Sequence, residues 1–155
     1  MPRAAGVDAI VIACFDDTGL DAVRAAAHCP VLGIGQSAYA MARLLGKRFS
    51  VVTTLAVSVP VIRDNIDHQG FGPDCTGVRP TGLPVLVVEA GGEAVLDRIS
   101  AEIELAAQED GASAAILGCA GMTHLRHALG QRTPLTVIDG VQASARLALA
   151  VAAKD

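Results

Sequence analysis

The sequence predicts an α/β fold in which parallel sheets are flanked by helices, and three observations support this. Short β-branched runs alternate with stretches of helical periodicity, the order typical of strand–helix repeats. Several of the runs are apolar at successive positions, as in strands buried on both faces. The 155 residues, 52% of them hydrophobic, suffice for a packed core and exclude a disordered chain.

The elements follow from the local patterns. Strands are predicted at residues 9–13, 30–34, 49–53, 84–88, 114–117 and 135–138. Helices are predicted at residues 20–27, 37–45, 59–68, 93–108, 122–129 and 141–153, several of them ended by a glycine. The segment 71–82 contains three glycines and two prolines and is predicted to be the only long loop.

The chain divides into unequal parts. Residues 47–130 have the alternation of a nearly complete α/β half, whereas residues 1–46 supply fewer strands than a self-sufficient sheet usually has. We therefore expect two similar flavodoxin-like halves, with the N-terminal half incomplete.

Composition limits the partners and the compartment. The net charge is −4, no basic run is present and Trp is absent, so no nucleic-acid partner is expected. No apolar run approaches the ~18–20 residues of a membrane span, and no signal-peptide core precedes Asp8. We expect a cytoplasmic protein without a membrane partner, with its cysteines reduced. Because these lack C-x-x-C spacing, no metal site is predicted.

Two of the four cysteines occupy equivalent places. Cys14 and Cys119 each follow a hydrophobic strand and precede a helix, where parallel sheets bind ligands. Such a pair can supply a thiolate base and a thiol acid on opposite sides of a ligand. A single cysteine of this kind is more often inert core filler, but two together favour the functional interpretation. Cys29 and Cys75 lack this context.

Other polar motifs are weaker. Residues 16–18 (Asp-Asp-Thr) form either a carboxylate pair or a helix cap, and the cap is favoured. The turn 118–121 can present backbone N–H groups to an oxyanion, although glycines in such turns have structural uses too. The pair Gly33 and Gly35 lacks the third glycine of a dinucleotide motif. His124 and His127 are more typical of a helix surface than of a metal site.

These residues are also similar to a known family. Residues 13–21 (ACFDDTGLD) and 116–122 (ILGCAGM) resemble the two cysteine motifs of hydantoin racemases, in the aspartate/glutamate racemase superfamily. Residues 30–36, 48–54 and 137–141 resemble further stretches of that family, in the same order. Family members begin with another strand and an Asn-Pro-Asn-Thr-type loop, and this sequence starts after both. By the same resemblance, residues 131–155 supply a strand and a helix that return to the first half.

The resemblance implies a cofactor-independent racemase of 5-substituted hydantoins. One thiolate of the pair Cys14 and Cys119 would remove the C5 proton, and the other thiol would reprotonate the opposite face. The substrate-binding residues it implies are Phe15, Asp16, Asp17, Thr53, Thr54, Gly118, Ala120 and Gly121. No pyridoxal-binding lysine is evident, since Lys47 and Lys154 are the only lysines.

Other functions remain open at this point. An aspartate/glutamate-type amino-acid racemase or an allantoin racemase would use the same two thiols. A decarboxylase relative would need only the second cysteine, so Cys14 argues against it. An inactive truncated fragment that only binds a ligand or oligomerises is a further alternative. The apolar composition and an unpaired sheet edge favour a homo-oligomer.

Overall fold

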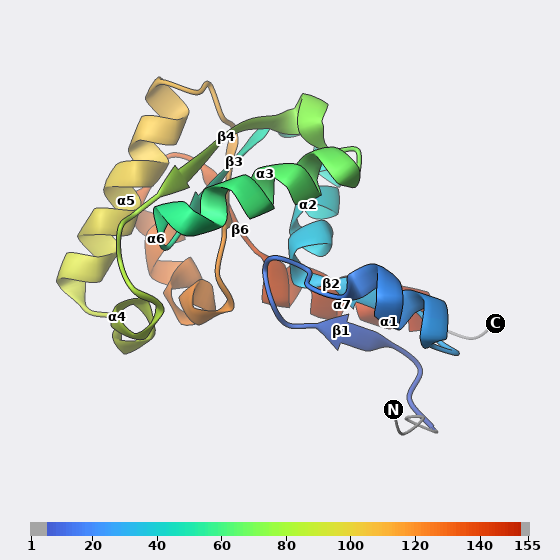
Figure 1. The fold of residues 1–155 in the computed structure, drawn as a ribbon. Helices are drawn as coiled ribbons and strands as arrows, with labels where there is room; N and C mark the ends of the chain where they lie inside the picture. Colours follow the sequence, from blue (N-terminus) through green and yellow to red (C-terminus); the bar gives the residue numbers. More distant parts are fainter. Residues whose placement is uncertain (1–5, 153–155) are drawn as a thin grey trace.

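The computed structural model describes residues 6–152 and has the predicted α/β fold (Figure 1). One small sheet pairs two strands in parallel, and a second sheet has four parallel strands in the order β4-β3-β5-β6. The strands are β1 (Ile10–Ile12), β2 (Val31–Gly33), β3 (Phe49–Thr53), β4 (Cys75–Pro80), β5 (Ala114–Leu117) and β6 (Thr136–Asp139). The predicted end of the last helix at Ala153 lies outside the described residues.

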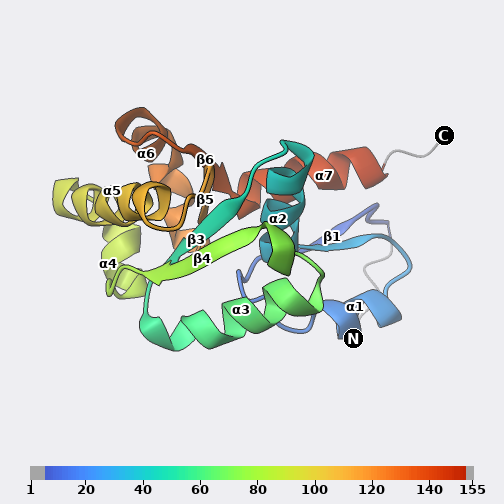
Figure 2. The same ribbon diagram turned by 90° about the horizontal axis from the view of Figure 1, so that it is seen from above.

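Helices cover both faces of the four-stranded sheet (Figure 2). They are α1 (Leu20–Ala26), α2 (Ile34–Leu44), α3 (Val59–His68), α4 (Val85–Ala90), α5 (Glu93–Gln108), α6 (Arg126–Arg132) and α7 (Gly140–Ala152). Short 3-10 helices are η1 (Ala56–Ser58), η2 (Gly72–Asp74) and η3 (Ala120–Leu125). Alternate residues of β3 point to opposite faces: Val51 packs with α2 and α3, and Val52 packs with α4, α5 and α6.

Two predictions for residues 71–90 are wrong. The predicted loop contains β4, an edge strand of the sheet, where Pro80 is tolerated. The predicted strand at 84–88 is α4, which buries Val88 and leaves Val85, Leu86 and Val87 exposed. A short apolar run does not by itself distinguish a strand from a helix. Cys75 therefore lies in a strand, and Glu89 lies on a helix that packs against η3.

The C-terminal third also differs in detail. The predicted helix from Met122 is a 3-10 helix followed by α6, and α6 continues through Gly130 instead of ending there. The strand β6 pairs with β5 in the four-stranded sheet, in a parallel register that places Ile116 opposite Ile138 in the core. Both β6 and α7 also contact residues 1–46: β6 contacts α2, and α7 packs against α2, β1 and β2. The division of the chain into halves stays a prediction.

All four aromatic rings of the chain form one cluster. Tyr39 of α2 lies 5.8 Å from Phe15, 5.4 Å from Phe49 and 5.6 Å from Phe71, measured between ring centroids. The contact with Phe15 is edge-on and the contact with Phe49 is stacked. Because Phe15 adjoins Cys14, the cluster fixes the segment after β1 to the core of the larger sheet.

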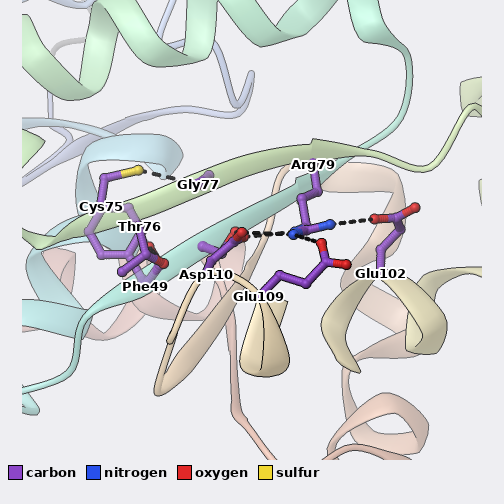
Figure 3. Close-up of polar contacts among 9 residues, drawn as sticks. Phe49, Cys75, Thr76, Gly77, Arg79, Glu102, Glu109 and Asp110 are labelled. Carbon is purple, nitrogen blue, oxygen red and sulfur yellow. Dashed lines mark hydrogen bonds and ion pairs between the residues drawn. The ribbon is translucent and has the colours of Figure 1, made fainter. Parts of the chain in front are cut away.

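An ion-pair cluster ties the edge strand β4 to α5 (Figure 3). The Arg79 guanidinium donates to both Asp110 carboxylate oxygens at 2.7 Å and to Glu109 at 2.6 Å, and it lies 3.6 Å from Glu102. These hydrogen bonds hold the pKa of Asp110 below its usual value. Gly77 leaves room for this carboxylate, since a Cβ there would lie 2.6 Å from Asp110 Oδ2. The cluster protects an otherwise open sheet edge.

Candidate active site

The segment that carries Cys14 is anchored by the carboxylate of Asp17. Its Oδ1 accepts the backbone N–H of Gly35 at 3.0 Å, and its Oδ2 accepts that of Gln36 at 2.7 Å. The side-chain amide of Gln69, directly after α3, donates to the same Oδ2 at 3.2 Å. The predicted cap is therefore present, but at the distant helix α2 and not at α1, which follows directly. The anchor fixes where Cys14 leaves the small sheet.

Glycines make this anchor possible. A Cβ on Gly35 would lie 2.5 Å from the carbonyl oxygen of Phe15, and one on Gly33 would overlap the Asp17 carboxylate. On α3, the Asn65 side chain donates to the Asp16 carbonyl at 2.6 Å. Close packing of the Cys14 segment thus explains the two glycines that resemble part of a dinucleotide motif.

The turn that carries Cys119 is built from β5 and its neighbour β3. The Gly118 N–H donates to the Val52 carbonyl at 2.8 Å, and the Thr53 hydroxyl donates to the Gly118 carbonyl at 3.1 Å. A Cβ on Gly118 would lie 2.8 Å from Val51, so only glycine fits without a shift. Cys119 then precedes η3, and the Gly121 backbone N–H donates to its sulfur.

Electrostatics link the two cysteine segments. Burial raises the pKa of the half-buried Cys119 thiol, and the hydrogen bond from Gly121 opposes this. The charges of Glu89, Cys14 and Asp16 raise the pKa of Cys119 further. Burial also raises the pKa of Asp16. Cys14 is exposed, and it lies near enough to Cys119 for the two sulfurs to interact electrostatically.

The residues expected to bind substrate fall into two groups. Five are buried, and they either form hydrogen bonds within the protein or pack in its core: Phe15, Asp17, Thr53, Thr54 and Gly118. The Thr54 carbonyl, for example, accepts the Gly82 N–H at 2.8 Å. Asp16, Ala120 and Gly121 are partly exposed beside the two thiols. A substrate contact remains a prediction for all eight.

Sequence reasoning missed Glu89. A Cβ on Gly121 would lie 3.0 Å from Glu89 Cγ, 3.7 Å from its Oε1 and 3.6 Å from Cys119 Sγ. The Glu89 carboxylate and the Cys119 sulfur therefore both lie close to the Cβ position of Gly121. A correct helix prediction at residues 85–90 could have pointed to Glu89, but the apolar run before Glu89 was predicted to be a strand.

Two kinds of feature are absent from the described part of the chain. Within residues 6–152, no three or more His, Cys, Asp or Glu side chains are grouped to hold a metal ion. In the same residues, no helix is both long enough and apolar enough to cross a membrane.

The sequence and the fold together define the class of protein. The family model described as Asp/Glu/Hydantoin racemase matches residues 1–148, and the chain belongs to this family. Among its relatives is a hydantoin racemase of Rhizobium meliloti, 48% identical over 96% of this chain and 62% of its own length. Another, from Pseudomonas sp. (strain NS671), is 40% identical over 92% of this chain and 57% of its own length.

Solved structures agree. The allantoin racemase from Pseudomonas fluorescens has a TM-score of 0.92 at 35% identity, over 97% of this chain and 64% of that one. The allantoin racemase from Klebsiella pneumoniae has a TM-score of 0.89 at 37% identity, over 96% and 60%. The chain thus spans about three fifths of the length of these relatives.

Proposed function

We propose that the chain carries the two-cysteine centre of a cofactor-independent racemase that acts on 5-substituted hydantoins or the related ureide allantoin. The observation that carries this proposal is the relation between Cys14 and Cys119. Each follows a parallel strand, in two different sheets, and the charge of one affects the other. Family membership and the similarity to hydantoin and allantoin racemases support it.

The chemistry is a proton transfer on each face of the ring. One thiolate takes the C5 proton, and the C–H electron pair moves into the adjacent carbonyl to give a planar enolate. The other thiol then delivers its proton to the opposite face, which restores the C–H bond with inverted configuration. The Gly121 N–H stabilises the thiolate form of Cys119. Positioned acid–base catalysis of this kind contributes about 10²–10⁴-fold.

The surrounding charges favour a neutral substrate. Glu89 and Asp16 both place negative charge beside Cys119. They would repel the carboxylates of aspartate or glutamate, whereas an uncharged hydantoin ring escapes this repulsion. This observation supports a cyclic ureide over an acidic amino acid.

The test uses enantiopure 5-isopropylhydantoin, allantoin and L-aspartate in heavy water, without added metal or pyridoxal phosphate. Proton NMR should show C5 deuteration of a ureide, and polarimetry should show loss of rotation at a comparable rate. Faster racemisation of aspartate than of either ureide would contradict the substrate class. Ureide binding without deuterium exchange would support the alternative of an inactive fragment that only binds ligand.

We further propose a cytoplasmic homo-oligomer. Val85, Leu86 and Val87 of α4 are exposed, and β6 is the edge of the four-stranded sheet opposite to β4. Exposed apolar side chains and open edges favour association between copies. Light scattering coupled to size-exclusion chromatography should give a mass above the 15.8 kDa of one chain. A mass of one chain would contradict this.

A further inference from the structure

We infer that Glu89 is a positioning residue of this site, whose carboxylate holds Cys119 in its protonated, proton-donating form. The inference rests on the proposed function in one respect, that the Cys119 proton is transferred to the substrate. The arrangement of Glu89 and Cys119 does not depend on the proposed function.

The helix α4 packs against η3 and so brings Glu89 to the turn after Cys119. Gly121 separates the two groups, and its missing side chain leaves space for both, as the distances from its Cβ position show. Gly121 has no positive φ, so its backbone does not require glycine. The close approach of the carboxylate and the sulfur explains why a small residue stands there.

The side chain of Glu89 has no partner within residues 6–152, where its carboxylate takes part in no hydrogen bond or ion pair. No cation of these residues is therefore paired with its negative charge, which acts on the nearby sulfur. A second carboxylate, that of Asp16, acts in the same direction from the segment after β1.

Other charged or titratable groups lie on η3 and on the elements packed against it. Asp139 of β6 accepts the Thr123 hydroxyl at 3.0 Å and the Gln142 N–H at 2.9 Å. His124 of η3 lies against α4, with its Nε2 3.2 Å from the Cβ position of Gly91. Arg126 of α6 and Arg146 of α7 line a separate cavity together with Asp139.

The consequence is a functional difference between the two thiols. Burial and the negative charges of Glu89, Cys14 and Asp16 raise the pKa of Cys119. The raised pKa favours the protonated form of Cys119, which is the acid for the enantiomer whose C5 proton faces Cys14. The opposite enantiomer requires Cys119 as the thiolate, a form that the Glu89 charge disfavours.

Racemisation rates alone do not reveal this difference. Two enantiomers have equal free energies, so kcat/KM is the same in both directions for every variant. The experiment therefore measures alkylation of Cys119 by iodoacetamide as a function of pH, quantified by peptide mass spectrometry. A Cys14→Ser background leaves one thiol in the site, so that the titration belongs to a single group.

In this background, Glu89→Gln should raise the alkylation rate of Cys119 about fivefold below the titration midpoint at low salt. The difference should shrink at about 0.5 M salt, because salt screens the interaction between partly exposed charges. Glu89→Asp keeps the charge and should behave like the parent. The control Glu104→Gln removes an exposed carboxylate of α5 and should leave the rate unchanged.

Equal rates in Glu89→Gln and its parent at low salt would overturn the inference, provided both unfold at the same urea concentration. A rise that also occurs in Glu89→Asp, or that salt does not reduce, would overturn it too, because it would report altered access to the sulfur. If alkylation follows the expectation while the chain with both cysteines racemises no hydantoin, the proposed function fails and the electrostatic role of Glu89 stands.

Discussion

The Asp17 carboxylate accepts the Gly35 backbone N–H at 3.0 Å and so joins the segment that carries Cys14 to the first turn of α2. The first N–H groups of a helix have no partner within the helix, and its dipole favours a negative charge there. The position of Cys14 thus depends on a helix that begins well beyond it in the sequence.

The substitution Gly35→Ala should disturb the Cys14 segment. Its new Cβ would meet the Phe15 carbonyl oxygen at 2.5 Å, and neither backbone can move away without breaking the Asp17 contact. We expect a loss of about 1–3 kcal/mol in unfolding free energy, measured by urea denaturation. In the control Gly130→Ala, nothing lies within 4 Å of the new Cβ. Because Gly130 is helical, this control should gain about 0.5–1 kcal/mol. Equal effects of the two substitutions would contradict the contact.

The substitution Asp17→Asn should change how stability depends on pH. Burial raises the pKa of Asp17 above 3.8, against the effect of hydrogen bonds from Gln69, Gln36 and Gly35. A raised folded pKa gives stability that is complete below the unfolded value and is lost as pH rises through the folded value. The difference in unfolding free energy, wild type minus variant, should therefore fall from about pH 4 towards neutrality. A difference that grows over this range would contradict the raised pKa.

The substitution Arg79→Met should weaken the attachment of β4 to α5. It leaves Asp110 without its main partner, and we expect a loss of about 1–2 kcal/mol, since solvent reaches part of the cluster. Because Arg79 lowers the folded pKa of Asp110, the stabilisation is present above 3.8 and is lost as pH falls through the folded value. Urea denaturation at several pH values checks this. The control Arg132→Met removes pairs with the exposed Glu93 and Asp97 and should change stability little. An equal loss in the control would contradict the cluster.

Strong periodicity made most of the fold predictable from the sequence. The run 114–117 is buried at every position and forms β5 as expected, and the long amphipathic pattern of 93–108 forms α5. The errors at β4 and α4 have a common cause, because in both segments the local sequence pattern is typical of a different element. Gly77 and Pro80 are typical of a loop but lie in an edge strand. Three consecutive apolar residues are typical of a buried strand but lie exposed on a short helix.

The candidate site was predictable only where its residues share a local context. Cys14 and Cys119 stand out because each directly follows a strand. The hydrogen bonds of Asp17 with Gly35 and Gln36 join residues that are far apart in the sequence, so no local sequence pattern predicts them. Glu89 reaches Cys119 only because α4 folds back on η3, and the error in that helix concealed it.

The central claim is that Cys14 and Cys119 together racemise a ureide. Its most direct test is proton NMR in heavy water alongside polarimetry, on the wild type and on four cysteine-to-serine variants, with enantiopure 5-isopropylhydantoin. Cys14→Ser and Cys119→Ser should nearly abolish loss of rotation, because a hydroxyl is a far weaker acid than a thiol and does not replace the thiolate. Each variant should exchange the C5 proton of no more than one enantiomer, since its remaining thiol faces only one side of the hydantoin ring. Cys29→Ser and Cys75→Ser should racemise like the wild type. Full racemisation by Cys14→Ser or Cys119→Ser would contradict the two-thiol account.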